Sequence, residues 1–133
     1  MAACLGVAVD LIGPAGFDMS DRNFKRAGLD YLPHALVERH VSFAAFREAQ
    51  SAANRRLVLL TTKAETAHVA FSFMPTDVLM LGRESAGVPD DVHQVVDARV
   101  RIPMQPGMRS LNIAVAGAIV LGEALRQTGQ FPA

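Results

Sequence analysis

The sequence predicts an α/β domain in which a mainly parallel sheet is flanked by helices. Two observations lead to this prediction: short apolar, strand-like runs alternate with helical patterns, and no repeat, low-complexity tract or linker interrupts the alternation. The chain has 133 residues, of which 50% are hydrophobic, and this suits a single domain with one core. We therefore expect residues 1–133 to form one domain.

Start and stop signals define the elements expected in the first half of the chain. Met1 to Leu5 has the pattern of a last helical turn, and Gly6 is suited to end it in a left-handed conformation. A strand is then expected from Val7 to Ile12, and the loop GPAGF follows it. The remaining elements expected here are a short helix at Asp21–Ala27, a strand at Ala35–Val41, a helix capped by Ser42 and a strand at Leu57–Thr62.

The second half continues the alternation of strands and helices. Its apolar runs are short and are followed by glycine or polar residues, as expected for strands that end in turns. The elements expected here are a weak strand at Ala67–Phe73, a buried strand at Asp77–Leu81, a helix at Pro89–Val96, a strand at Arg99–Ile102 and an apolar helix at Asn112–Gln127.

Composition excludes several classes of protein. Thirteen basic residues balance thirteen acidic ones, so any RNA contact must come from a local patch rather than from an overall positive field. The single cysteine, Cys4, excludes an internal disulfide, argues against a zinc site and suits a reducing cytoplasm. The longest apolar run, Ile113 to Gly122, is too short to cross a bilayer, so we expect no membrane association. The four histidines show no metal-ligand spacing; we expect them in loops or on the surface, and we expect no metal.

Two joined motifs in the last third of the chain carry the most specific information. Leu81 to Pro89 reads LGRESAGVP, and Ile102 to Asn112 reads IPMQPGMRSLN and opens the apolar helix that ends in EALRQTG. Together they resemble the SPOUT RNA methyltransferases, and within these the tRNA wobble-position 2′-O-methyltransferases. The segment RAGLDY, Arg26 to Tyr31, is similar to a stretch typical of the same group. The first motif alone is a weak signal, and the second motif at this distance makes the resemblance specific.

The resemblance implies a fold and a cofactor that periodicity alone does not reveal. The fold is the SPOUT α/β knot, in which the carboxyl-terminal segment is threaded through a loop to make a trefoil knot. The cofactor is S-adenosylmethionine, bound at the turns that follow parallel strands. By position, the resemblance places the cofactor pocket at Leu60, Gly82, Ile102 and Ser110. Without a ligand, Leu60 and Ile102 would be ordinary core residues and Ser110 the N-cap of the last helix.

The implied reaction is the in-line attack of a ribose 2′-hydroxyl of tRNA on the methyl group of the cofactor. The resemblance gives a role in shaping the active site to Glu84, Ser110 and Asn112. The candidate RNA-binding residues are Arg22, Lys25, Arg26 and Arg109. A tRNA-facing role and an ordinary solvated surface fit the basic cluster equally well, and Arg109 has the same two interpretations.

The start of the sequence departs from the pattern of the family that it resembles. There, a strand and an Asn-Gly-rich turn come first and lead to an Arg on the first helix, and this sequence lacks all three. We therefore expect that the chain begins after the first strand and first motif and retains at most weak methyl transfer. Arg83 and Gly122 also depart from the pattern, because relatives often carry Pro and Tyr at these positions.

The resemblance also implies a homodimer in the cytoplasm. Small residues on the last helix, Ala114, Ala116, Gly117 and Ala118, would let it approach its twofold mate, although burial against the chain's own sheet would need the same surface. Two other functions stay open: a non-catalytic RNA-binding or cofactor-binding homodimer, and a 2′-O-methyltransferase of ribosomal RNA. The function that we expect is 2′-O-methylation of the tRNA wobble nucleotide, a cytidine or a modified uridine.

Overall fold

The computed structural model describes residues 1–13, 37–82, 88–108 and 111–133. The chain divides into two compact units, one formed by Met1–Ala49 with Pro132–Ala133 and the other by Gln50–Phe131. The expected helix at Asp21–Ala27 lies outside the described residues. The assignment of the whole chain to one domain stays a prediction.

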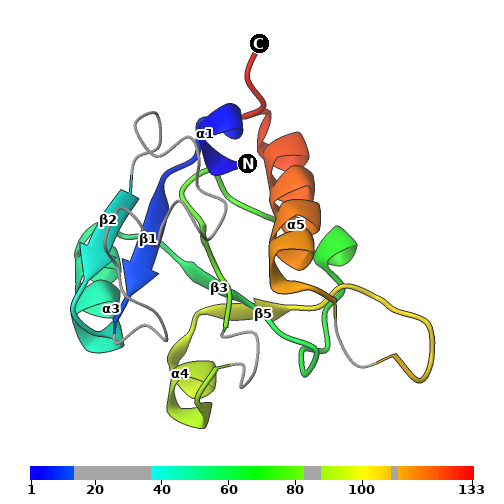
Figure 1. Ribbon diagram of the computed structural model, residues 1–133, viewed down its shortest axis with the longest axis horizontal. Helices are drawn as coiled ribbons and strands as arrows, with labels where there is room; N and C mark the ends of the chain where they lie inside the picture. Colours follow the sequence, from blue (N-terminus) through cyan, green and yellow to red (C-terminus); the bar gives the residue numbers. More distant parts are fainter. Residues whose placement is uncertain (14–36, 83–87, 109–110) are drawn as a thin grey trace. The chain divides into compact units, whose positions relative to one another are not determined.

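The first unit is built on two parallel strands, β1 (Val9–Ile12) and β2 (Val37–His40), which pair along their full length (Figure 1). The helix α1 (Ala2–Leu5) precedes them and ends at Gly6, whose φ of 68° confirms the expected left-handed stop. Most of α3 (Phe43–Ala52) also belongs to this unit.

Local contacts explain why α3 begins where it does. The Ser42 hydroxyl accepts a hydrogen bond from the Ala45 backbone N–H at 3.2 Å, which confirms the expected N-cap. Phe46 on the first turns is 2% exposed and packs edge-on against the His40 ring, with 5.0 Å between ring centroids. The helix therefore covers the end of β2 through this aromatic pair.

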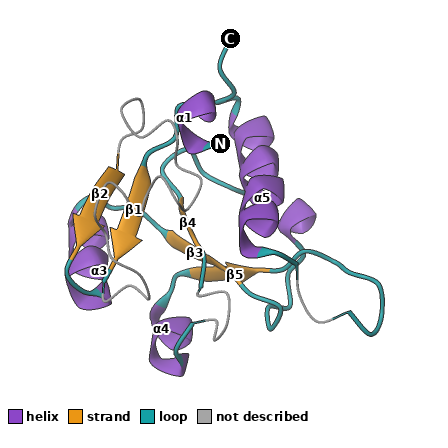
Figure 2. Ribbon diagram, viewed as in Figure 1, coloured by secondary structure: helices purple, strands orange, loops and turns teal. Residues whose placement is uncertain are grey.

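The second unit contains a three-stranded parallel sheet in the order β4-β3-β5 (Figure 2). The pairing among all the described strands is parallel, as the sequence predicts. The elements of the second unit are, in chain order, β3 (Leu57–Leu60), the 3₁₀ turn η2 (His68–Ala70), β4 (Val78–Met80), α4 (Asp90–Val95), β5 (Ala98–Val100) and α5 (Ile113–Thr128).

The core of the second unit lies between its sheet and α5. Val58 of β3, Val100 of β5 and Val120 of α5 are each 0% exposed and pack together with Phe73. Side chains alternate between the faces of a strand, so Leu57 and Leu59 are buried on the opposite face. Figure 2 shows α4 on that opposite side of the sheet from α5. No helix within the described ranges has the length and hydropathy needed to cross a membrane.

The expected strand at Ala67–Phe73 is wrong. Ala67 makes only an isolated bridge with Arg101, and the chain then turns into η2. The backbone groups that a neighbouring strand would bind are taken by a side chain instead: Gln127 of α5 bonds to the Phe71 carbonyl and the Phe73 N–H. Apolar composition alone does not distinguish this side-chain contact from a strand pairing.

Candidate cofactor site and active site

Three expected cofactor-binding residues lie at the carboxyl ends of three neighbouring parallel strands. Leu60 is the last residue of β3, and Gly82 and Ile102 each lie two residues beyond the end of β4 and β5. The register places Leu60 beside Val100 and Leu59 beside Met80, so these strand ends share one edge of the sheet. In parallel α/β sheets, ligands bind at this edge.

The side chains of Leu60 and Ile102 are partly buried and pack against the core cluster of the second unit. Both are therefore core residues, as expected if no ligand binds. Their side chains face the core, so the groups that could meet a ligand are the backbone N–H and C=O groups of the following turns. The cofactor role of both residues, and of Gly82, stays a prediction.

The chain leaves β3 after Leu60 and returns beside β5 a few residues later. The Thr61 N–H donates to the Val100 carbonyl at 2.9 Å, and the chain then makes a short turn in which the Ala64 N–H donates to the Thr61 carbonyl. On its return, the Thr66 carbonyl accepts from the Arg101 N–H at 2.9 Å and the His68 N–H donates to the Arg101 carbonyl at 2.8 Å. We call residues 61–65 the edge loop.

The amino terminus of α5 is capped by Asn112 and not by Ser110. The Asn112 side-chain oxygen accepts from the backbone N–H of Ala114 at 2.9 Å and of Val115 at 3.3 Å. The alternative role of Ser110 as N-cap is therefore wrong, because the helix begins at Ile113. Asn112, expected in the active site, uses this oxygen to hold the helix end, and its catalytic role stays a prediction.

The other expected site residues lie outside the described residues. For catalysis and cofactor binding these are Glu84 and Ser110. For RNA binding they are Arg22, Lys25, Arg26 and Arg109. Their roles stay predictions.

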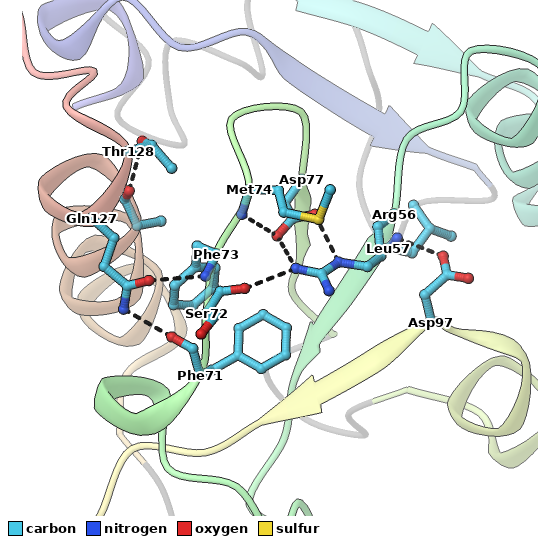
Figure 3. A network of polar contacts seen from close by, with 11 residues as sticks. Arg56, Leu57, Phe71, Ser72, Phe73, Met74, Asp77, Asp97, Gln127 and Thr128 are labelled. Carbon is cyan, nitrogen blue, oxygen red and sulfur yellow. Dashed lines mark hydrogen bonds and ion pairs between the residues drawn. The ribbon is translucent and has the colours of Figure 1, made fainter.

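A network of polar contacts at the other, amino-terminal edge of the sheet was not predicted from the sequence (Figure 3). Gln127 donates through Nε2 to the Phe71 carbonyl at 2.8 Å and accepts through Oε1 from the Phe73 N–H at 2.9 Å. Its Nε2 also lies 2.7 Å from Oε2 of Glu123, one turn earlier. Hydrogen bonds from Arg126 and Gln127 lower the pKa of Glu123 to about 2.

An ion pair between Arg56, just before β3, and Asp77 also holds the segment that contains Phe71 and Phe73. Arg56 donates through Nε to Oδ1 of Asp77 at 2.9 Å and through Nη2 to Oδ2 at 2.7 Å, and it also donates to the Ser72 carbonyl (Figure 3). The Asp77 side chain is 3% exposed, and the guanidinium lies 4.9 Å from the centre of the Phe71 ring. The hydrogen bonds to Asp77 raise the pKa of Arg56. Segment 71–77 is thus held both by the start of β3 and by α5.

Comparison with known proteins identifies the family to which this geometry belongs. The sequence model of the SpoU rRNA Methylase family matches residues 1–122. The chain belongs to this family. The resemblance to the SPOUT methyltransferases is thereby confirmed.

Named relatives of this SpoU-family chain share one description. A protein of Beijerinckia indica named tRNA (cytidine(34)-2′-O)-methyltransferase is 60% identical over 129 residues, which are 97% of this chain and 81% of the relative. A protein of the same name from Escherichia coli K12 is 40% identical over 131 residues, with 97% and 82% covered.

Solved structures that are similar to this chain also come from studies of methylation and methyltransferases. A structure described as "Structural insights into the 2-OH methylation of C/U34 on tRNA" is 41% identical, with a TM-score of 0.86 over 95% of this chain and 82% of that one. The SpoU methyltransferase AviRb from Streptomyces viridochromogenes, in complex with the cofactor AdoMet, is 30% identical with a TM-score of 0.81, over 95% and 52%.

The expectation that all the histidines lie on the surface or in loops is wrong for His40 and His68. His40 lies in β2 with a side chain 9% exposed, and its Nε2 is 2.8 Å from Oδ1 of Asp10. His68 begins η2, is 8% exposed and has an Nδ1 without a hydrogen-bond partner in the described part of the chain. Neighbouring residue spacing did not reveal this burial, because it arises from contacts distant in sequence.

Among the residues that the structure describes, three potential metal ligands lie together in the first unit. Single ligand atoms of Asp10, Glu38 and His40 lie within 4.8 Å of one another. The His40 ring nitrogen already has the Asp10 carboxylate as its partner, so a side-chain contact between strands accounts for this arrangement. The absence of a metal site stays a prediction.

Proposed function

We propose that this chain transfers a methyl group from S-adenosylmethionine to the ribose 2′-hydroxyl of nucleotide 34 of a tRNA, a cytidine or a modified uridine. The observation that carries the proposal is the similarity over 97% of the chain to proteins named for this reaction. A structure concerned with C/U34 methylation, similar over 95% of the chain, supports the same substrate.

The cofactor fits the carboxyl edge of the sheet in the second unit. There the ends of β3, β4 and β5 bring Leu60, Gly82 and Ile102 to one edge, and Gly82 carries no side chain that would obstruct a ligand. In this proposal, backbone groups near Leu60 and Ile102 bind the adenosine part, Gly82 leaves room for the bent cofactor, and Ser110 closes the pocket. When bound, the cofactor supplies an activated methyl group.

The protein's own contribution to the reaction is position. A ribose hydroxyl is a poor nucleophile at neutral pH, so it must be held near the methyl group while its proton is removed. In this proposal Glu84, Ser110 and Asn112 shape that site. The tRNA backbone would be held by the basic residues Arg22, Lys25, Arg26 and Arg109.

We also propose that the active form is a cytoplasmic homodimer with a carboxyl-terminal trefoil knot. The first half of α5 supports the dimer, because Val115 is 50% exposed and Ile119 is 40% exposed one turn later. Ala114 and Ala118 are exposed beside them. An exposed apolar helix face of this kind is suited to a second copy of the same helix. A monomeric mass at micromolar concentration would contradict the dimer.

Incubation with unmodified tRNA tests the proposed reaction. The purified chain is mixed with tRNA and S-adenosylmethionine, and the nucleosides are identified by mass spectrometry after site-specific digestion. The expected product is a 2′-O-methylated nucleotide at position 34, with no product on ribosomal RNA. Titration calorimetry with the cofactor separates the outcomes: binding without methylation would make the chain a cofactor-binding protein, and neither binding nor methylation would overturn the proposal.

A further inference from the structure

We propose that Lys63 and Arg101 form a phosphate-contacting pair that positions the tRNA backbone at the carboxyl edge of the β4-β3-β5 sheet. The inference rests on the proposed function, because it assigns two contacts to that same substrate. Neither residue belongs to the motifs that identify the family. Arg101 directly follows β5, and Lys63 lies three residues after the end of the adjacent strand β3.

Lys63 is presented by a turn with a fixed backbone. Within the edge loop its N–H donates to the Thr61 hydroxyl at 3.2 Å, and the Ala64 N–H donates to the Thr61 carbonyl at 3.3 Å. Ala64 is 8% exposed and anchors the loop, whereas Lys63 itself is exposed. An ammonium group on such a turn can meet a ligand without first ordering the backbone, so less conformational entropy opposes binding.

Arg101 is held at the same edge by its backbone. Its N–H and C=O are both bonded to the returning chain, at Thr66 and His68. Val100 before it is 0% exposed, so alternation along the strand places Arg101 on the face of the sheet away from α5. The register that pairs Leu60 with Val100 brings the first residue after β3 beside Arg101.

The two cations differ from the other arginines of this sheet. Arg56 binds Asp77, and Arg99 donates to the His93 carbonyl at the end of α4, so both guanidinium groups already hold parts of the fold. Within the described residues, neither Lys63 nor Arg101 forms an ion pair, and the loop carboxylate Glu65 is bonded to neither.

Phosphate is the ligand whose chemistry fits this pair. Arg101 as a whole residue is partly buried, and no carboxylate of the described residues pairs with its guanidinium group. A cation at such a position interacts more strongly with an anion than a fully solvated cation does. Arginine binds phosphate oxygens through a planar fork, and a nearby lysine adds a point charge. Because the chain carries no net charge, contact with a polyanion depends on local cations of this kind.

Charge-removing substitutions at the two ends of the same sheet test the pair. The variants are Lys63→Gln, Arg101→Gln and the double variant. The matched control is Arg55→Gln, because Arg55 is an exposed arginine just before β3, at the opposite edge, and no ion pair joins it to the described residues. For each protein, tRNA affinity is measured by fluorescence anisotropy over a series of salt concentrations, and cofactor affinity by calorimetry.

Each single variant is expected to weaken tRNA binding roughly fivefold and to reduce the slope of log affinity against log salt by about 0.7 to 0.9. The reduction in slope should be about twice as large in the double variant. Arg55→Gln should bind tRNA as the wild type does, and all variants should keep the cofactor affinity and thermal midpoint of the wild type. Because Lys63 is exposed, Lys63→Gln keeps the test valid if Arg101→Gln does not fold.

The outcomes separate this inference from the proposed function. If the wild-type protein binds tRNA and the variants bind it with the same affinity and salt slope, the role of Lys63 and Arg101 is overturned and the proposed function is not. A loss of cofactor affinity in the variants would also overturn it, because the cations would then serve the carboxylate of the cofactor. Wild-type protein that binds no tRNA would overturn both proposals.

Discussion

The two halves of α5 present opposite kinds of surface. The first half exposes apolar side chains, Val115 and Ile119, and offers no polar side chain after the N-cap Asn112. The second half carries Glu123 and Gln127, which bond to each other and, through Gln127, to segment 71–73. The second half therefore binds the protein's own backbone through polar side chains. The first half packs Gly117 and Val120 inward and leaves one apolar face exposed. This difference predicts that substitutions on the exposed face of the first half change assembly and that those of the polar residues in the second half change stability.

The largest effect is expected from a charge in the exposed half. Ile119→Asp should weaken dimerisation roughly 100-fold, because an unpaired carboxylate would be buried in the interface. Sedimentation equilibrium measures the change, and the thermal midpoint of the monomer should stay close to that of the wild type. Gln94→Asp on the exposed surface of α4 is the control. An undiminished dimer in Ile119→Asp would place the interface elsewhere.

In the second half, Gln127→Ala should reduce the free energy of unfolding by about 1–3 kcal/mol. The substitution leaves the Phe73 N–H and the Phe71 carbonyl without their side-chain partner. Urea unfolding measures the loss. Arg126→Ala on the same turn is the control, because its side chain is 69% exposed and should matter little. Equal losses in the two variants would show that the hydrogen bonds of Gln127 to Phe71 and Phe73 contribute nothing specific.

At the start of the helix, Asn112→Ala should reduce the free energy of unfolding by about 1 kcal/mol, because two N–H groups lose their acceptor. Asn112→Asp keeps an acceptor oxygen there and should retain the stability. If Asn112→Asp nevertheless loses methyl transfer, the residue has the expected role in the active site as well as the cap. Normal activity in both variants would leave it with the cap alone.

Between the two halves, Gly122→Ala should stabilise the protein by about 0.5–1 kcal/mol. Alanine has the higher helix propensity, and a Cβ at this position meets no atom within 4 Å. Gly117→Ala is the matched comparison, since its Cβ would lie 2.9 Å from a methyl group of Leu81, which would have to move. A gain at Gly117 as large as at Gly122 would show that this close approach is not a constraint.

The smallest effect is the pH dependence of the hydrogen bonds that Glu123 accepts from Arg126 and Gln127. The folded-state pKa of Glu123 is about 2, below its ordinary value of 4.5, so its contribution is present above pH 4.5 and is lost as the pH falls toward 2. The difference in urea midpoint between wild type and Glu123→Gln should therefore shrink over this range. A constant difference from pH 7 to pH 3 would contradict the role of the Glu123 carboxylate.

The sequence predicts the strands and helices well where apolar periodicity and end signals agree. The left-handed stop at Gly6, the cap at Ser42 and the parallel pairing of β3, β4 and β5 are confirmed. The strands of the second unit are one or two residues shorter than expected, and each ends early, as β5 does before the apolar Ile102. The resemblance to SPOUT methyltransferases is confirmed by the family match.

Most of the errors concern contacts between residues far apart in sequence, and one concerns where a helix begins. Segment 67–73 looks like a strand, and only the position of Gln127, more than 50 residues later, shows what binds its backbone. The cap at Asn112 instead of Ser110 depends on where α5 begins, and a sequence with two capping residues close together does not settle that. The burial of His68 likewise requires knowledge of the tertiary structure.

The edge loop has a consequence for how the protein can change. The chain is tied down on both sides of this loop: the Thr61 N–H donates to the Val100 carbonyl of β5, and the Thr66 carbonyl, directly after the loop, accepts from the N–H of Arg101. Residues between such anchors can be inserted or exchanged at a small entropic penalty, because the distance that the loop spans is set by the sheet. A change in loop length there would alter what the edge presents to a substrate while leaving strand register intact, so substrate preference can evolve at this point independently of the fold.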